Sequence, residues 1–595
     1  MIHSVSLAPR KNPNPHYFAV GMVAYRRDRS SAIHRRSSFA LKMKLLFLYF
    51  ASIFALWASG TNAQELPISE TDVFIQSGEV SESSVIIMAR CNNEMDSKVT
   101  LFLNGNVAKE GQAFAARDYT ISFKVEELSS NTEYTYQVQC STLQDLTEEA
   151  EFMSVEGSFK TAPSPDDEVA FNFVWVADLA GQGWGRNPDF ELTNAQGETV
   201  RGGYIVFDTM EALEPEFALF QGDMIYADNA IPPVKTVEVA LGVPEAYNWT
   251  NNPSKDFVAV TLPEFRDNWK YNFGDEKMQS FLAKVPVFVQ WDDHEVTNNW
   301  WPGEVMRGSG IYEDGLAVDS LYLNSLQAFY EFNPIEEGQL LYRKQRFGKH
   351  VEIFFVDYRS YREPNPENDN PEGSTMMGEA QLAWFMQGLK DSKATWKIIS
   401  SHDPLGIVTG GDGDRDAFGQ EKPEILGREV ELQEILKFIK ENNIRNVISL
   451  TSDVHFTAHV NLHPDRAEGN WTDFLPLDEF VIGPIHAGSF GPNFMDTSFG
   501  AEYVYEYGPL TAGFERWANL PPAQSDLQSF GHAAVAEDGT LEIKLMNIDG
   551  SVMYSQTLTP EPLDPVDPPP TSSATNYSVI FWSLLCWLNA FIGLF

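Results

Sequence analysis

Hydrophobic and polar residues alternate in short runs between residues 66 and 162. The runs are DVFIQSGEV, SSVIIMARC, KVTLFLNG, DYTISFKV, EYTYQVQC and AEFMSVEGSFKTAP, with Asn, Ser and Gly between them. An alternation of period two places the apolar side chains on one face of a strand. Short strands with regular turn signals between them are typical of a sandwich. The pattern therefore predicts a small all-β domain over 66–162, which we interpret as accessory.

The pattern changes after Pro163. Continuous apolar runs now alternate with longer segments of helix or loop character: FNFVWVAD, PEFALFQGD, VPVFVQWDDHE, VEIFFVDYR, WKIISSHDP and NVISLTSDVH. Such runs suit strands that are covered on both faces. Between the last two, EVELQEILKFIKENN places its apolar residues on one face of a helix. We therefore predict a layered α/β domain over 168–553.

Both ends of the chain have the composition of targeting segments. An apolar run at 45–58 follows two lysines and precedes a small-residue cleavage site, which predicts a leader and signal peptide over 1–63. Residues 554–578 are rich in Pro and acidic residues and are expected to form an extended stalk. The uncharged tail 579–595 fits either a lipid-anchor attachment signal or a transmembrane helix. The sequence thus predicts a secreted or cell-surface protein with membrane attachment at its C-terminus, and its three glycosylation sequons agree with export.

Charge and cysteine content further limit the possible partners of the protein and the compartment in which it folds. The formal net charge is −42, and so acidic a surface repels nucleic acid. Outside the apolar tail the chain has two cysteines, Cys91 and Cys140, at the ends of two predicted strands. Either they form a disulfide, which would contribute roughly 4 kcal/mol in the chain-entropy model, or they are two unpaired buried thiols. An oxidising compartment favours the disulfide.

Acidic residues and histidines follow five of the six predicted strands in the second domain. These residues are Asp178; Asp223, followed by Tyr226; Asp292, Asp293, His294 and Glu295; His402 and Asp403; and Asp453 with His455. A single Asp at a strand end is most often a helix cap or turn residue. Five such ends together predict a common crevice, because ligands collect beyond the carboxyl ends of strands in open α/β sheets. Metal ions would remove the repulsion between buried carboxylates; imidazole and phenolate favour iron, and clustered carboxylates favour calcium.

Several motifs occur in an order that resembles a known family. They are GDMIY at 222–226, WDDHEVTNN at 291–299, DYRSYR at 357–362, DRDAFG at 414–419, LGREVEL at 426–432, SDVH at 452–455 and GPI at 483–485. Over roughly residues 66–550 the chain resembles the alkaline phosphatase D (PhoD-like) branch of the calcineurin-type metallophosphatases. The resemblance implies a metallophosphatase-type four-layer β-sandwich flanked by helices. LSSNTEYTY at 128–136 is similar to a turn of fibronectin type III domains, which implies a fibronectin- or immunoglobulin-like domain in front.

The resemblance also implies roles for individual residues. Asp223 would bridge two ions; Tyr226, His455 and Asp178 would hold Fe3+; Asp293 and Asp453 would hold Ca2+; and His294 would stabilise or protonate the leaving group. Many members of the family have Cys where this chain has Asp178, which leaves the identity of the first metal open. The implied activity is that of an alkaline phosphatase or phosphodiesterase, which would hydrolyse small or polymeric phosphate esters through a metal-activated hydroxide.

Other residues have more than one interpretation. Arg186 is a candidate phosphate clamp or a partner in a surface ion pair, and His402 is a candidate substrate contact or metal ligand. We interpret Arg359 and Arg362 as partners of buried carboxylates, and His486 as a core histidine.

Two other functions are alternatives to the phosphoesterase. A surface-anchored binding protein would use the β-sandwich and have an inactive α/β domain, but the intact Asp and His set argues against it. A serine hydrolase has little support, because no Gly-x-Ser-x-Gly segment follows a predicted strand.

Overall fold

The computed structural model describes residues 73–91, 94–143, 152–237, 246–411, 413–523 and 525–562. The chain divides into two units, 1–65 and 66–595, and every described residue belongs to the second. The predicted leader, most of the stalk and the hydrophobic tail lie outside the described residues. Within the described ranges, no helix combines the length and the apolar character needed to cross a membrane.

Two large mixed sheets form the centre of this unit. The first has nine strands in the order β26-β25-β24-β8-β11-β14-β1-β2-β5. Their bounds are β1 Val73–Gly78, β2 Val85–Cys91, β5 Thr120–Val125, β8 Phe171–Val176, β11 Phe217–Phe220, β14 Val287–Val289, β24 Ser529–Val535, β25 Leu541–Asn547 and β26 Val552–Leu558. The second has seven strands in the order β15-β16-β17-β20-β22-β21-β23. Their bounds are β15 Arg343–Phe347, β16 Val351–Phe355, β17 Trp396–Ser400, β20 Val447–Thr451, β21 Thr457–Leu462, β22 Leu477–Val481 and β23 Ala501–Tyr507.

The central strands β8, β11 and β14 are parallel and buried on both faces, as their continuous apolar sequences predict. In β8, Phe173 and Trp175 face a core shared with β16, β17 and β20 of the other sheet. Val174 and Val176 face a core shared with helices instead. The two sheets therefore pack against each other, and helices cover their outer faces.

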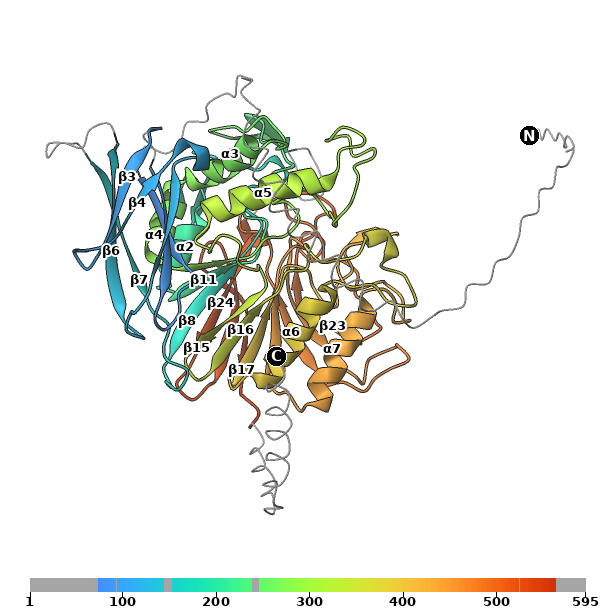
Figure 1. The fold of residues 1–595 in the computed structure, drawn as a ribbon. Coiled ribbons are helices and arrows are strands. Elements are labelled where there is room, and N and C mark those ends of the chain that lie inside the picture. The colour runs from blue at the N-terminus through green and yellow to red at the C-terminus, as the bar shows by residue number, and fades with distance from the viewer. Residues whose placement is uncertain are drawn as a thin grey trace, which may run out of the picture. The chain divides into compact units, whose positions relative to one another are not determined.

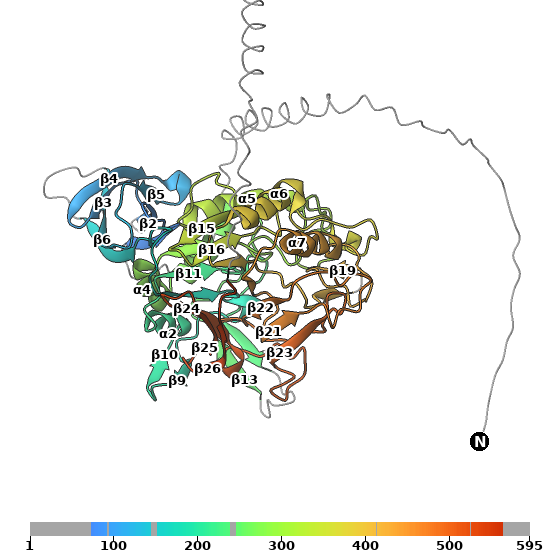
Figure 2. The same cartoon turned by 90° about the horizontal axis from the view of Figure 1, so that it is seen from below.

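Helices α2 Val206–Glu211, α3 Leu262–Phe273, α4 Glu276–Lys284 and α5 Val318–Phe332 contribute to the outer core of the nine-stranded sheet. Helices α6 Gly378–Asp391 and α7 Glu429–Glu441 cover the seven-stranded sheet and lie side by side (Figures 1 and 2). The position of α7 confirms the helix expected from its apolar face. This arrangement of helix, sheet, sheet and helix is the predicted four-layer fold.

The N-terminal strands are not separate from this fold. β1 pairs in parallel with β14, with Gly78 opposite Val287, so β1, β2 and β5 extend the nine-stranded sheet. A Cβ at Gly78 would lie 2.3 Å from the carbonyl oxygen of Val287, which explains the glycine at this close approach. A separate four-stranded sheet, in the order β4-β3-β6-β7, faces the part of the nine-stranded sheet formed by β1, β2 and β5 (Figure 1). It comprises β3 Ser97–Leu103, β4 Asn106–Ala113, β6 Glu133–Thr142 and β7 Met153–Lys160.

A disulfide joins Cys91 of β2 to Cys140 of β6, and so links these two sheets. Of the two sequence interpretations, the bridge is confirmed and the pair of free thiols is wrong.

One predicted boundary is also wrong. β26 pairs with β25 along its length, with Leu541 opposite Leu558, so the ordered strand continues five residues past the expected limit at 553. The prolines that predict the stalk begin only at Pro560, so residues 554–558 remain free to form a strand.

Candidate metal centre

Four predicted ligands lie just after strands, in loops that reverse sharply. Asp178 follows β8, Asp223 follows β11, and Asp453 and His455 follow β20. Their φ angles are 61°, 53°, 71° and 59°. A left-handed conformation is unfavourable for a residue other than glycine, and such strain is concentrated at functional sites. The loops from both sheets meet at the same end of the sandwich.

The first group of ligands contains Asp178, Asp223 and His455, whose ligating atoms all lie within 4.8 Å of one another. The hydroxyl of Tyr226 is 3.0 Å from Nε2 of His455 and 3.5 Å from Oδ1 of Asp178. Nδ1 of His455 is hydrogen-bonded to the carbonyl oxygen of Gly488. Burial lowers the pKa of His455 to about 4, so its imidazole is neutral. A proton on Nδ1 leaves the lone pair of Nε2 directed at the group.

A second group adjoins the first. Asp223, Asp293 and His294 have ligating atoms within 4.8 Å of one another, and so do Asp292, Asp293 and Asp453. Because Asp223 belongs to the first group and to one of these, the acidic residues form one continuous cluster. The geometry thus offers two adjacent cation positions that share Asp223.

The electrostatics of this cluster fit bound cations. Burial, followed by the charges of Asp292 and Asp293, raises the pKa of Asp178, Asp223 and Asp453 well above the usual range. Oδ2 of Asp178 and Oδ1 of Asp293 are buried, and neither has a hydrogen-bond partner among the described residues. Buried carboxylate oxygens in that state are costly. The donor set therefore suits metal ions.

His294 adjoins these groups and has a carboxylate partner of its own. Its Nδ1 is 2.7 Å from Oδ1 of Asp228, and its ring lies 4.1 Å from that of Tyr226. Burial lowers the pKa of His294, but the carboxylates of Asp228 and Asp293 outweigh this effect and raise the pKa to about 9. In the metal-free chain these carboxylates therefore favour the protonated imidazole of His294.

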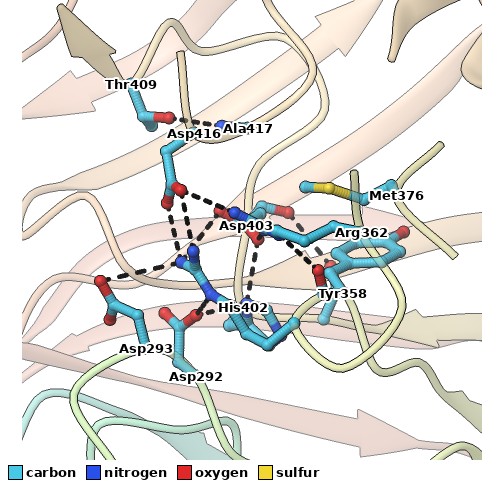
Figure 3. Close-up of polar contacts among 12 residues, drawn as sticks. Asp292, Asp293, Tyr358, Arg362, Met376, His402, Asp403, Thr409, Asp416 and Ala417 are labelled. Carbon is cyan, nitrogen blue, oxygen red and sulfur yellow. Dashed lines mark hydrogen bonds and ion pairs between the residues drawn. The ribbon is translucent and has the colours of Figure 1, made fainter. Parts of the chain in front are cut away.

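A buried network of arginines lies behind the cluster. The guanidinium of Arg359, with no exposed surface, is 2.5 Å from Asp292, 2.8 Å from Asp416, 3.4 Å from Asp403 and 4.0 Å from Asp293. Arg362 contacts Asp403 at 2.5 Å and Asp416 at 2.6 Å. Figure 3 shows these carboxylates converging from separate loops. The prediction that both arginines pair with buried carboxylates is confirmed.

A pocket of about 680 Å³ opens over the cluster. Asp223, Asp293, His294, Asp453 and His455 line it, whereas Asp178 and Tyr226 are buried beneath them. Most of the remaining wall comes from three parts of the chain: residues within 304–312; Thr409, Gly410, Asp414 and Asp416; and Phe490, Asn493 and Trp517.

A family model described as PhoD-like phosphatase matches residues 173–521. The chain belongs to this family. It is 28% identical to alkaline phosphatase D of Bacillus subtilis (strain 168) over an alignment of 252 residues that covers 39% of this chain and 41% of that protein. The match therefore spans less than half the length of this curated relative.

Two solved structures have a similar fold. A structure titled as that of PhoD has a TM-score of 0.56 at 18% identity, over 84% of this chain and 90% of its own. A purple acid phosphatase, PPD1 from yellow lupin (Lupinus luteus) seeds, has a TM-score of 0.50 at 14% identity, over 83% and 74%. At these identities the likeness shows the fold alone, a metallophosphatase-type α/β fold.

The PhoD-like chain brings all six predicted ligands together, but two other predicted residues lie elsewhere. His402 is fully buried, with Nδ1 2.7 Å from Asp292 and 3.2 Å from Asp403, and it does not line the pocket. This position does not favour the predicted substrate contact of His402, because this strand end faces the arginine network. Its ligating atom lies within 4.8 Å of those of Asp292 and Asp403, so the alternative role as a metal ligand stays a prediction.

Arg186 does not line the pocket either. Its guanidinium packs 5.0 Å over the ring of Tyr271, and a Cβ at Gly274 would lie 3.0 Å from it. The side chain is buried, so neither the phosphate clamp nor the surface ion pair describes it.

His486 is a core histidine as predicted, buried with Nε2 3.1 Å from the carbonyl oxygen of Gly185. Asp228 could not be identified from the sequence. It lies in the same loop as Tyr226, but a lone Asp after a turn carries no signal that it pairs with a histidine far along the chain.

Proposed function

We propose that this chain is an exported, metal-dependent phosphoesterase that hydrolyses organic phosphate esters, either monoesters or diesters. The observation that carries the proposal is the convergence of Asp178, Asp223, Tyr226, Asp293, Asp453 and His455 around buried carboxylate oxygens that have no partner within the described ranges. Membership in the PhoD-like family supports it.

Different residues would hold the two ions. Tyr226, His455 and Asp178 would hold Fe3+, because phenolate and imidazole favour a transition metal. Asp293 and Asp453 would hold Ca2+, which prefers carboxylate oxygens, and Asp223 would be shared. When bound, a pair of ions at such a site lowers the pKa of a water molecule and neutralises the phosphate oxygens.

His294 would supply the proton that the leaving alcohol needs. Asp228 occupies Nδ1, so Nε2 is the ring nitrogen available to the pocket. The Asp228 carboxylate keeps the ring protonated and fixes its orientation. Proton donation from Nε2 to the ester oxygen would let the alcohol leave uncharged.

Replacing His294 by Gln is expected to lower kcat by roughly 10²-fold to 10⁴-fold for an alkyl phosphate, whose leaving group needs the proton. The loss should be much smaller for 4-nitrophenyl phosphate, whose leaving group is stable as an anion. Asp228→Asn should also lower kcat for the alkyl phosphate, but by less than His294→Gln does. Steady-state kinetics on both esters test this, and equal losses on the two would show that His294 has only a structural role.

Removal of the ions is expected to abolish hydrolysis and to lower the melting temperature, since ions that bind only the folded chain stabilise it. Readdition of Fe3+ and Ca2+ should restore both properties. A phenolate ligand to ferric iron should colour the loaded protein, and Tyr226→Phe should remove the colour. Metal analysis, visible spectra and calorimetry measure these effects; hydrolysis that survives complete metal removal would overturn the proposal.

We also propose attachment at the cell surface through residues 579–595. The uncharged C-terminal sequence and the signal-like run at 45–58 support it. The Cys91–Cys140 disulfide agrees with an oxidising compartment.

A further inference from the structure

An exposed tryptophan forms part of the pocket wall. Trp517 lines the pocket and is 62% exposed, the largest exposed fraction among the large hydrophobic residues described. A single exposed hydrophobic residue is common at a protein surface, but the position of Trp517 on the wall of the pocket sets it apart from the others. Leu510 and Phe494 are also exposed nearby in the sequence, but neither lines the pocket. Trp517 therefore presents an aromatic surface to whatever enters.

The backbone fixes this tryptophan relative to the metal centre. Gly491 N donates to the carbonyl oxygen of Arg516 at 2.8 Å, and Ser489 N donates to that of Leu520 at 3.0 Å. The segment 489–491 is in turn bound to the ligand loop, because Phe490 N donates to the carbonyl oxygen of His455 at 3.1 Å. The ring of Phe490 lies 5.1 Å from the ring of His455 and also lines the pocket. An aromatic wall thus extends outward from a metal ligand.

The same pocket contains two buried hydrogen-bond acceptors that receive no donor from the described residues. Asn493 donates Nδ2 to the carbonyl oxygen of Val408 at 3.1 Å, which fixes the orientation of its amide. Its Oδ1 is buried and has no partner among the described residues, and the same is true of Oε2 of Glu304. Both residues line the pocket. Buried acceptors without donors are costly, so a ligand with N–H groups would satisfy them.

Together these features discriminate between kinds of organic group. The pocket is far larger than a phosphate needs, so the rest of the ester has room inside it. An alkyl chain would leave the acceptors of Asn493 and Glu304 unsatisfied. A flat ring with amino substituents would both stack on Trp517 and donate to those acceptors.

We propose that this site, given the proposed phosphoesterase function, takes nucleoside phosphates whose base carries an amino group, with the base stacked on Trp517 and hydrogen-bonded to Asn493. The phosphate lies over the metal centre and the base lies against the wall formed by Phe490, Asn493 and Trp517. The acidic surface of the protein opposes binding of a polynucleotide, but a single nucleotide brings its charge directly to the ions.

The test compares three esters with the metal-loaded enzyme: adenosine 5′-phosphate, phenyl phosphate and glycerol phosphate. Wild type should have its highest kcat/KM for adenosine 5′-phosphate. Trp517→Ala should lower kcat/KM roughly tenfold for the two esters with rings and leave glycerol phosphate unchanged. Asn493→Leu should lower it by roughly three- to tenfold for adenosine 5′-phosphate alone. Leu510→Ala, which removes an exposed side chain outside the pocket, should change none of them.

Each result separates the hypotheses. If wild type hydrolyses none of the three esters, the proposed phosphoesterase function fails. If it hydrolyses all three without preference, or if Trp517→Ala lowers them equally or not at all, the phosphoesterase function stands and the nucleoside inference fails. If Asn493→Leu lowers the hydrolysis of all three esters, the substitution has disturbed the pocket wall. Asn493→Asp, which keeps the acceptor oxygen, must then restore the hydrolysis of adenosine 5′-phosphate. If it does not, the proposed hydrogen bond between Asn493 and the base is wrong.

Discussion

Replacing Asp223 by Asn is expected to abolish phosphate ester hydrolysis. Asp223 is the residue common to both groups of ligands, and its backbone position is fixed by a bond from Asp223 N to Glu295 at 3.1 Å. The amide keeps the shape of the side chain but removes the charge that would hold two cations together. The loss of activity should exceed the roughly 10- to 100-fold that follows when a residue that only orients a metal ligand is removed.

The metal-free protein provides the control for this variant. Asp223 lies among buried carboxylates that repel one another, so Asn at this position should leave the metal-free chain at least as stable as wild type. Metal content, kcat and the thermal transition in chelator measure the three effects separately. Full activity in Asp223→Asn would contradict the assignment of the centre, and a binding protein with an inactive α/β domain would show no hydrolysis in either form.

Replacing Arg359 by Leu is expected to destabilise the folded protein by about 3–5 kcal/mol, because it leaves buried carboxylates without their cation. Arg359 has no exposed surface and makes its closest contacts with Asp292 and Asp416. Arg359→Lys should destabilise the folded protein less than Arg359→Leu does, since it keeps the charge. It should still destabilise it somewhat, because lysine cannot reproduce the planar fork of the guanidinium.

Urea unfolding of the metal-free chain measures the effect of Arg359→Leu. Arg201→Leu is the matched control, because Arg201 pairs with Glu191 at the surface, with 71% and 50% of the two side chains exposed. An exposed pair contributes at most about 1 kcal/mol. If the two variants unfold at the same urea concentration, the buried network does not stabilise the fold as we infer.

The apolar runs predicted the central strands because the residue types within each run are enough to indicate a strand that is buried on both faces. Phe171, Phe173 and Trp175 of β8 face the other sheet and Val174 and Val176 face helices, so the position of this strand requires apolar residues on both of its faces. The pairing of β1 with β14 was not predictable in this way. It joins residues about two hundred positions apart through backbone groups, and nothing in the alternation of either strand specifies its partner.

The same distinction holds for the metal centre. The positions of Asp178, Asp223, Asp293 and Asp453 directly after predicted strands identified them as candidate ligands, because the carboxyl ends of strands in this fold meet at one edge. Which ends face the pocket depends on how the loops turn. His402 also follows a strand, yet its loop directs it to Arg359 and its carboxylates, away from the pocket.

The amino-acid sequence by itself determined the layered α/β class, the family and the set of candidate ligands, since each depends on residue type and order along the chain. Only the tertiary structure decided that Asp228 holds His294, that Arg186 packs on Tyr271, and that Trp517 lies on the wall of the pocket. These contacts join residues from distant segments, and their energies depend on distance and burial, which exist only after the chain has folded.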